Sequence, residues 1–267
     1  MNSETHFRPL VLIPTYNTGE RLPRTVEEVL GVSETPVWVV VDGSSDGSDA
    51  LLSPLQEKYS EGKLRVIRLK ENRGKGCAVL AGAEIALDGG FTHVLTVDAD
   101  GQHPAEMIPR YLEAAQTDPE ALIIGQPVFD DSAPRIRVNG RKVANLLAAV
   151  EVGGGVIGDA LFGMRLYPLQ AFVRRMKRLV RWGANRYDFE PEIAVRLVWD
   201  GVPTLKLATP VKYFNESEGG ISHYHYWRDN LKMAAMHAFR LLPGTLLRAP
   251  MLLRRKFLER RKVFCLS

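Results

Sequence analysis

Three oxygen-bearing side chains stand at alternate positions in one short segment: Asp98, Asp100 and Gln102. They come directly after the apolar run from Thr92 to Val97, which is typical of a buried strand. Divalent cations such as Mg²⁺ and Mn²⁺ prefer oxygen ligands, and two carboxylates and an amide could supply three of them from this span. An acidic turn that merely ends a strand would give the same local pattern, so the rest of the chain has to decide between the two.

Two further turns carry groups suited to binding a nucleotide. Asp42 could accept hydrogen bonds from a uracil or guanine edge or from a ribose, although an Asx-type turn that caps the following helix is an equal alternative. The segment from Asn72 to Gly76 predicts an anion-binding turn, because glycines allow close backbone approach and a helix begins there. This segment lacks the P-loop pattern, and the turn after the first strand lacks Gly-x-Gly-x-x-Gly, so a dinucleotide cofactor is disfavoured.

The elements that must position these residues alternate along the first half of the chain. We expect strands at 9–16, 37–41, 64–69, 92–97 and 121–125, with helices at 20–30, 48–58, 76–87 and 104–116 between them. This alternation predicts an α/β fold in which βαβ units form a doubly wound parallel sheet. Ligands of such sheets bind beyond the carboxyl ends of the strands, where Pro14, Asp42 and Asp98 are all expected. Their convergence on one edge argues against the simple acidic turn.

After Gln126 the regular alternation is lost. Helices are expected at 136–151, 169–182 and 190–199, a strand at 160–167 and an edge strand at 204–214. The polar segment 130–134 reads as a loop, and the three glycines at 153–155 as a flexible joint. We interpret the chain up to Ser222 as one domain.

Four motifs occur in the order and spacing found in the family 2 inverting glycosyltransferases: Ile13–Asn17, Val41–Ser48, Asn72–Gly76 and Asp98–Pro104. The chain resembles most closely the dolichyl- or polyprenyl-phosphate mannose synthase branch, whose metal motif has the same Asp-Ala-Asp-x-Gln-His form. The likeness extends over residues 9 to 215. It implies the GT-A fold, a Rossmann-like, mostly parallel sheet with helices on both faces. It also implies that 1–222 is the catalytic domain, with a nucleotide-sugar and metal half at 9–126 and an acceptor half at 127–222.

The resemblance further implies roles for individual residues. Mg²⁺ or Mn²⁺ would bridge the diphosphate of a nucleoside-diphosphate sugar and would be held by Asp98, Asp100 and Gln102. The nucleoside and phosphates would be held by residues at the ends of the first strands and at the third helix, namely Pro14, Thr15, Tyr16, Asp42 and Lys75. The segment Asp159–Arg165 matches a loop that shapes the acceptor and donor-sugar side, and Gly219–Ser222 matches a later turn.

Some positions depart from the family pattern. Thr18 replaces a usual glutamate, Val41 replaces an acid, and Pro127 stands where many members have a phosphate-binding arginine. Arg135, Arg137 or Arg141 are candidates to compensate for it. These departures bear on the identity of the donor base and on the mannose-synthase activity.

The chemistry follows from charge. A nucleoside diphosphate leaves with developing negative charge, which a divalent cation offsets. Asp100 is therefore counted with the catalytic groups. An acceptor phosphate is already anionic and needs no base, whereas a hydroxyl acceptor would need one, and the candidates are Asp188, Glu190 and Glu192. An acidic cap at a helix start is the alternative for these three acids. For His103 we favour a supporting or capping role over direct ligation.

The end of the chain, 223–267, has a different character. His223 to Trp227 alternate histidine with aromatic residues, as in a lid over the site or an amphipathic surface segment. From Arg240 to Lys262 there are eight basic residues and one acid among leucines, with Pro243, Gly244 and Pro250 expected to break the helix. Such a tail suits an anionic membrane surface, and no recognition motif for nucleic acid accompanies it.

Composition is compatible with this interpretation. The 45% hydrophobic and 25% charged content is that of a globular protein, and no run of about 18 apolar residues suggests a spanning helix. No signal peptide is evident and the two cysteines are far apart, which favours a cytoplasmic protein, peripheral at the inner face of the membrane. We therefore expect a metal-dependent inverting glycosyltransferase with a lipid-linked acceptor such as polyprenyl phosphate. The alternatives are transfer to a hydroxyl of another lipid, polyene or glycan, or a nucleotide-sugar-binding protein without turnover.

Overall fold

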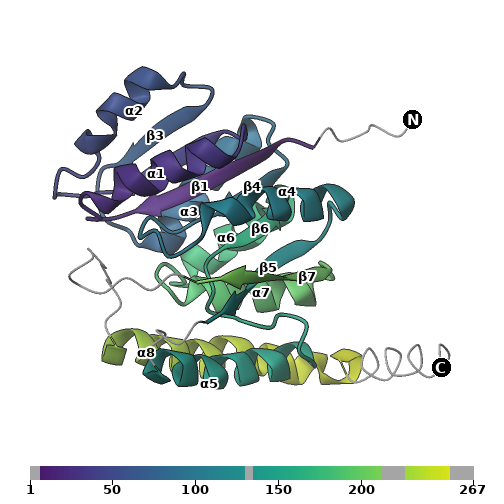
Figure 1. Ribbon diagram of the computed structural model, residues 1–267. Coiled ribbons are helices and arrows are strands. Elements are labelled where there is room, and N and C mark those ends of the chain that lie inside the picture. Colours follow the sequence, from purple (N-terminus) through teal and green to yellow (C-terminus); the bar gives the residue numbers. More distant parts are fainter. Residues whose placement is uncertain (1–6, 130–134, 212–225, 253–267) are drawn as a thin grey trace.

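One seven-stranded sheet forms the centre of the protein (Figure 1). The computed structural model describes residues 7–129, 135–211 and 226–252. The spatial order of the strands is β3-β2-β1-β4-β6-β5-β7. In chain order they are β1 (Pro9–Thr15), β2 (Val37–Asp42), β3 (Leu64–Leu69), β4 (His93–Thr96), β5 (Leu122–Val128), β6 (Arg165–Pro168) and β7 (Thr204–Pro210).

Helices cover both faces of this sheet. They are α1 (Arg21–Val32), α2 (Ser53–Lys58), α3 (Lys75–Asp88), α4 (Ile108–Thr117), α5 (Arg135–Val152), α6 (Leu169–Arg181), α7 (Phe189–Trp199) and α8 (Tyr226–Ala235). The apolar sides of α1, α2 and α4 pack in one core, and those of α3, α6 and α7 in a second core on the opposite face. The expected mostly parallel sheet with helices on both faces is confirmed.

The strand β1 explains why the first half of the chain was readable from its sequence. Leu10 and Leu12 point into one core, and Val11 and Ile13 into the other, so every second residue alternates between two buried faces. A strand buried on both faces reads as a continuous apolar run. Its parallel neighbours β2 and β4 follow the same pattern and end at the same edge.

The second half differs from the expectation in one strand. β6 is antiparallel to both β4 and β5 and lies between them. It covers only Arg165–Pro168 of the expected 160–167, because residues 160–164 form a loop whose carbonyls accept hydrogen bonds from a buried arginine. Strand order is set by long-range packing, which local periodicity does not encode. The boundary drawn at 126/127 falls inside β5, and the boundary at 222/223 lies outside the described residues.

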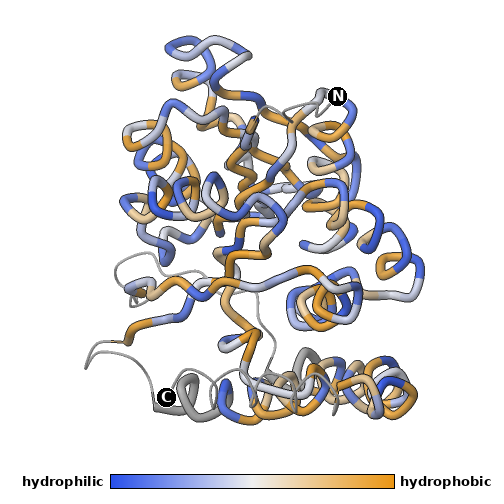
Figure 2. The backbone as a smooth tube through the Cα atoms, turned by 90° about the vertical axis from the view of Figure 1, so that its right-hand side faces the viewer, coloured by the Kyte–Doolittle hydropathy of each residue, from blue (hydrophilic) through white to orange (hydrophobic). Residues whose placement is uncertain are grey.

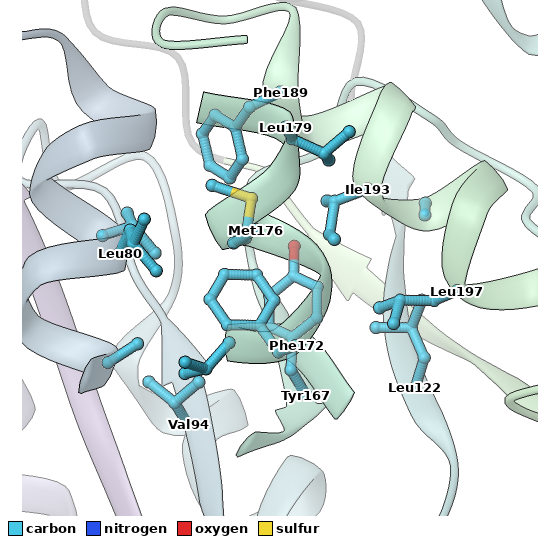
Figure 3. Packing of buried hydrophobic residues seen from close by; sticks show 14 of the residues in the cluster. Leu80, Val94, Leu122, Tyr167, Phe172, Met176, Leu179, Phe189, Ile193 and Leu197 are labelled. Carbon is cyan, nitrogen blue, oxygen red and sulfur yellow. The ribbon is translucent and has the colours of Figure 1, made fainter. Parts of the chain in front are cut away.

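The core between α6 and α7 fixes where α7 begins. Figure 3 shows Phe189, the first residue of α7, beside Met176 and Leu179 of α6. Burying an aromatic side chain of this size removes a large apolar area from water, so the start of the helix is held firmly against α6. The residues that follow Phe189 are thereby placed at the carboxyl edge of the sheet.

Two helical segments form a further layer on one side of the domain, at the bottom of Figures 1 and 2. One is α5, and the other is α8 with a π-helical segment (Met236–Leu241) and the helical residues 242–252. Glu151 of α5 lies 2.7 Å from Nδ1 of His237 in the second segment. No helix in the described ranges has the length and apolar content that a membrane span needs.

The expected breaks at Pro243, Gly244 and Pro250 are wrong, since the chain stays helical through all three. Proline removes a backbone donor and crowds the preceding turn. The π-helical segment ends at Leu241, two residues before Pro243, so the helix type changes in the turn that precedes the proline.

Candidate active site

The turns after β1 and β2 are joined by hydrogen bonds at the carboxyl edge of the sheet. The backbone N–H of Ser45 donates to Oδ1 of Asn17 at 2.8 Å, and the N–H of Gly19 donates to Asp46 at 3.0 Å. Thr15 and Thr18 hydroxyls lie 2.7 Å apart. Pro14, Thr15 and Tyr16 therefore stand where a nucleoside site was predicted, at the end of β1.

Asp42 fixes the turn that opens α3. Its two carboxylate oxygens accept the backbone N–H groups of Arg73 and Gly74 at 2.9 and 2.8 Å. The N–H of Gly76 donates to the carbonyl of Asn185 at 3.0 Å. These amides are used within the protein, so the prediction that they form an anion-binding turn is not supported by the geometry. Contact of Asp42 with a nucleoside stays a prediction.

Gly74 shows why this turn needs glycine. Its φ of +95° is a conformation that side chains disfavour, and a Cβ there would lie 2.2 Å from the carbonyl oxygen of Asn185. The turn is thus pressed against the segment before α7. This close approach brings the first residue of α3, Lys75, next to the first turn of α7.

Lys75 connects two carboxylates that are distant in the sequence. Its Nζ lies 2.6 Å from Oδ1 of Asp98 and 2.6 Å from Oε1 of Glu190. Burial works to lower the pKa of Lys75, but the charges of Asp98 and Glu190 outweigh it and hold that pKa well above its usual value. Burial likewise works to raise the pKa of Asp98, and Lys75 lowers it overall. Both acids therefore face one ammonium group.

The pKa of Asp100 shows that negative charge is in excess at this site. Burial, and then the charge of Asp98, raise the pKa of Asp100 to about 7. Its Oδ1 accepts the backbone N–H of Gln102 at 3.0 Å. Two carboxylates that repel each other in this way suit a divalent cation, and Mg²⁺ is commonly held by one or two carboxylates together with substrate phosphates. Among the described residues there is no group of three His, Cys, Asp or Glu side chains that could hold a metal ion.

His103 supports the metal motif from behind. Its Nδ1 accepts the backbone N–H of Asp98 at 3.0 Å, and its Nε2 lies 3.8 Å from Oδ2 of the same residue. Burial lowers the pKa of His103 to about 4, with Asp98 acting in the opposite direction. A neutral ring that accepts at Nδ1 carries its proton on Nε2, which leaves no free lone pair for a metal. The favoured supporting role agrees with this geometry.

The loop before β6 closes around the same carboxylates. A Cβ at Gly163 would lie 2.9 Å from Oδ2 of Asp98 and 3.0 Å from Oε1 of Glu190. The fully buried guanidinium of Arg165 donates to the carbonyls of Phe162, Ala160 and Glu190. The segment predicted to shape the donor-sugar side is therefore packed directly on the acids, and Arg165 joins it to α7.

Asp188 and Glu192 lie in a different cluster from Glu190. Glu192 is fully buried and contacts Arg196 at 2.8 Å and Arg240 at 3.1 Å, and Asp188 also pairs with Arg240. Burial raises the pKa of Glu192, and the two arginines oppose it. Of the three acids proposed as a base, only Glu190 is brought to Asp98 and Lys75.

Two residues were not singled out in the sequence. Burial raises the pKa of Tyr187 to about 12, with Lys75 opposing and Asp98 and Glu190 contributing, so this ring lies within electrostatic reach of the site. Arg165 was noted only as the end of a motif. The sequence signal for Tyr187 was its position directly before the acids at 188, 190 and 192. The signal for Arg165 was that a charged residue begins an otherwise apolar strand.

Other predicted groups are placed elsewhere or not described. Nη1 of Arg141 lies 2.8 Å from Asp159, so this candidate for the missing phosphate-binding arginine is ion-paired beside the 159–165 loop. The side chains of Arg135 and Arg137, the turn Gly219–Ser222 and the lid segment at 223–225 lie outside the described residues, as do the side chains of 226–227.

Comparison with known proteins agrees with this geometry. The sequence model of Glycosyl transferase family 2 matches residues 10–186. A polyprenol monophosphomannose synthase from Mycolicibacterium smegmatis is 30% identical over 219 residues, which cover 80% of each chain. An undecaprenyl-phosphate mannosyltransferase from Micrococcus luteus is 34% identical over 171 residues, which cover 62% of this chain and 65% of that protein.

Solved structures show the same architecture. Glucosyl-3-phosphoglycerate synthase from Mycobacterium tuberculosis, in complex with Mn²⁺ and UDP-glucose, matches 91% of this chain and 78% of its own with a TM-score of 0.61. Another structure of that protein contains Mg²⁺ and UDP and gives the same TM-score. The identity is 17% in both, so the likeness concerns the fold, and it confirms the expected GT-A fold.

Proposed function

Since the chain belongs to glycosyl transferase family 2 and is a glycosyltransferase, we propose that it moves a sugar from a nucleoside-diphosphate sugar to a polyprenyl phosphate. The proposed reaction inverts the anomeric carbon and depends on a divalent cation. The observation that carries it is the meeting of Asp98, Asp100, Lys75 and Glu190 at the carboxyl edge of the sheet. Both named relatives act on polyprenyl phosphates by name, which supports the acceptor class.

The donor is proposed to bind across the ends of β1, β2 and β4. Pro14, Thr15 and Tyr16 would contact the nucleoside from the end of β1, with Asp42 holding the neighbouring turn. The hydrogen bonds that join the first two turns pre-organise this surface, so less freedom is lost when a nucleotide binds. This surface suits a uracil or a guanine base.

Asp98, Asp100 and Gln102 are proposed to hold Mg²⁺ or Mn²⁺ together with the diphosphate. The cation would act as a Lewis acid that offsets the charge developing on the leaving nucleoside diphosphate. Burial and the charge of Asp98 raise the pKa of Asp100 to about 7, and the charges of Lys75 and Arg21 oppose this without outweighing it. The position of Asp100 therefore favours a cation over a further anion.

Lys75 and Glu190 are proposed to act as a pair beside the diphosphate. Glu190 pairs with the ammonium group of Lys75 at 2.6 Å, so its carboxylate is engaged before any substrate arrives. A phosphate acceptor is already anionic and needs no proton acceptor, whereas a hydroxyl acceptor would require Glu190 to leave that pair. The pairing supports phosphate as the acceptor, and it supports a role of Glu190 in holding Lys75 beside the diphosphate.

A ligand panel tests this proposal. UDP, GDP, UDP-glucose and GDP-mannose would each be combined with Mn²⁺, Mg²⁺ or EDTA in a thermal-shift measurement, because ligands of the folded state raise its melting temperature. The donor that binds would then be offered with polyprenyl phosphate in detergent, and glycolipid would be measured. Metal-dependent binding followed by transfer is expected. Binding without transfer to any acceptor would instead identify a nucleotide-sugar-binding protein, and no binding would contradict the site.

A further inference from the structure

The helical layer beside the catalytic domain has two contrasting faces. We call α5 and the helical stretch 226–252 together the basal layer; they lie side by side in Figures 1 and 2. Their inner sides carry Ala148 and Val152 of α5 and Met233, Met236 and Leu241 of the second stretch, all within the core. These contacts orient both helices, so their opposite sides face outward together.

The outward sides are strongly apolar. On α5 they present Leu146, Leu147 and Val150, and on the second stretch Phe239, Leu246 and Leu247, of which Phe239 is 80% and Leu247 82% exposed. Over 141–152 and 231–252 the exposed residues include only two charged side chains, Lys142 and Lys232. The outer face of a helix in water normally carries charged and polar groups. This outer face is apolar instead, so its burial away from water would be favourable.

The rest of the described surface offers a useful comparison. Other large apolar side chains that are exposed, such as Val32, Leu51 and Trp182, occur singly on different elements. Scattered residues of this kind are ordinary, but a continuous patch over two neighbouring helices marks an interaction surface. The basal layer is such a patch.

The charge of the sequence that follows the basal layer indicates what covers this apolar patch. The sequence directly after Leu252 holds six basic residues between Arg254 and Lys262, with Glu259 as the single acid. A second copy of the chain would bring the same positive charge to the interface, whereas anionic lipid headgroups carry the opposite charge. Apolar side chains flanked by lysine and arginine are the combination that binds an anionic bilayer surface.

We propose that the outer face of the basal layer docks flat on an anionic lipid bilayer, with side chains of both α5 and the 226–252 stretch entering the acyl region. Docking deepens the proposed function. It rests on that function in one respect, namely that docking would bring the site to a lipid-linked acceptor. The tail alone was expected at the membrane, and α5 supplies a second, parallel line of contact.

The layer is rigidly joined to the site. Arg240 of the π-helical segment pairs with Asp188 and Glu192, which flank Glu190, and Nε1 of Trp199 donates to the carbonyl of Glu151 at 2.8 Å. Docking would therefore hold the acids at a fixed height and orientation above the bilayer.

Vesicle flotation tests the proposal without donor or acceptor. Wild type would be compared with the pairs Leu146→Gln/Val150→Gln and Leu246→Gln/Leu247→Gln, and with Leu51→Gln as an exposed leucine on the far side of the sheet. On vesicles of phosphatidylcholine with phosphatidylglycerol, each pair should reduce partitioning by about 10-fold or more, and the control should bind as wild type. Binding to phosphatidylcholine alone should be weaker. The unfolding midpoints of all variants should match, since these side chains are exposed.

Three results would overturn the proposal. The first is that wild type fails to float with either kind of vesicle. The second is that the double variant in α5 binds as well as wild type. The third is that the protein forms a dimer in solution, that both double variants dissociate this dimer, and that the protein does not bind vesicles. Asp98→Asn separates this question from catalysis, because it should float as wild type does even when transfer is lost.

Discussion

The Nζ of Lys75 lies 2.6 Å from Oε1 of Glu190, although 115 positions separate the two residues. The same ammonium group lies 2.6 Å from Oδ1 of Asp98. Charges removed from water are costly unless they are paired, so this arrangement stabilises two carboxylates in one place. The metal motif after β4 and the first turn of α7 thereby become parts of one site.

Lys75→Met should destabilise the metal-free protein. It would leave Asp98 and Glu190 facing each other without a cation, and removal of one partner from a buried ion pair typically costs about 3 kcal/mol. Urea unfolding in EDTA measures the change in the free energy of unfolding. Mn²⁺ should recover more stability in this variant than in wild type, because it supplies the missing positive charge.

Lys58→Met is the matched control, since Lys58 is exposed and its pair with Glu27 is long, at 4.0 Å. Exposed pairs of this kind contribute little, so its unfolding curve should stay within about 0.5 kcal/mol of wild type. Equal stability of the Lys75 and Lys58 variants would contradict the role given to Lys75.

Glu190→Gln and Glu192→Gln should fail in different ways. Glu190→Gln disturbs the group that holds Lys75 beside the site, so transfer should fall by about 100-fold while the fold is retained. Glu192→Gln weakens the buried pairs with Arg196 and Arg240, so it should cost about 3 kcal/mol of stability with little change in the rate per folded molecule. Initial rates and urea unfolding on both variants give the comparison, and a reversed pattern would refute the assignment.

The sequence could have predicted that Glu190 and Glu192 lie in different clusters, but it could not have predicted that Lys75 pairs with Glu190. Positions two apart on a helix point in different directions, so Glu190 and Glu192 could not both face one site. Which of them faces Asp98 depends on α7 packing through Phe189 on α6, a contact between distant segments. The motifs after β1, β2 and β4 were predicted because parallel strands place their carboxyl ends together.

The outer face of α5 shows the limit of periodicity. Leu146 and Val150 recur at a helical spacing, which ordinarily indicates a side that packs on a core. The structure buries Ala148 and Val152 instead and exposes the larger residues. Spacing identifies the helix, but it does not say which face meets protein and which meets another phase.

The contribution of His103 to stability should fall in mild acid because this residue is buried in its neutral form, whereas the raised pKa of Asp100 acts in the opposite direction over the same range. The folded pKa of His103 is about 4 against about 6.5 when unfolded, so the unfolded state binds the proton more readily between these values. The contribution is therefore present above pH 6.5 and is lost as the pH falls toward 4, by about 3 kcal/mol at most. Burial lowers the pKa of His93 as well, which acts in the same direction.

Urea unfolding at several pH values in EDTA checks this expectation. His103→Gln keeps an acceptor for the N–H of Asp98 but cannot titrate, so wild type should lose stability relative to this variant as the pH falls from 6.5 to 4. A variant with the same pH dependence as wild type would show that His103 does not carry the effect.

The most direct test of the central claim is release of nucleoside diphosphate during sugar transfer to polyprenyl phosphate, measured for wild type, Asp98→Asn and Asp88→Asn. Asp88 is an exposed carboxylate at the end of α3 and serves as the control. Wild type and Asp88→Asn should turn over with Mn²⁺ or Mg²⁺ and stop in EDTA, while Asp98→Asn should lose about 1,000-fold in rate because the leaving group is no longer stabilised. Turnover that survives EDTA, or an Asp98→Asn rate near that of wild type, would contradict the account.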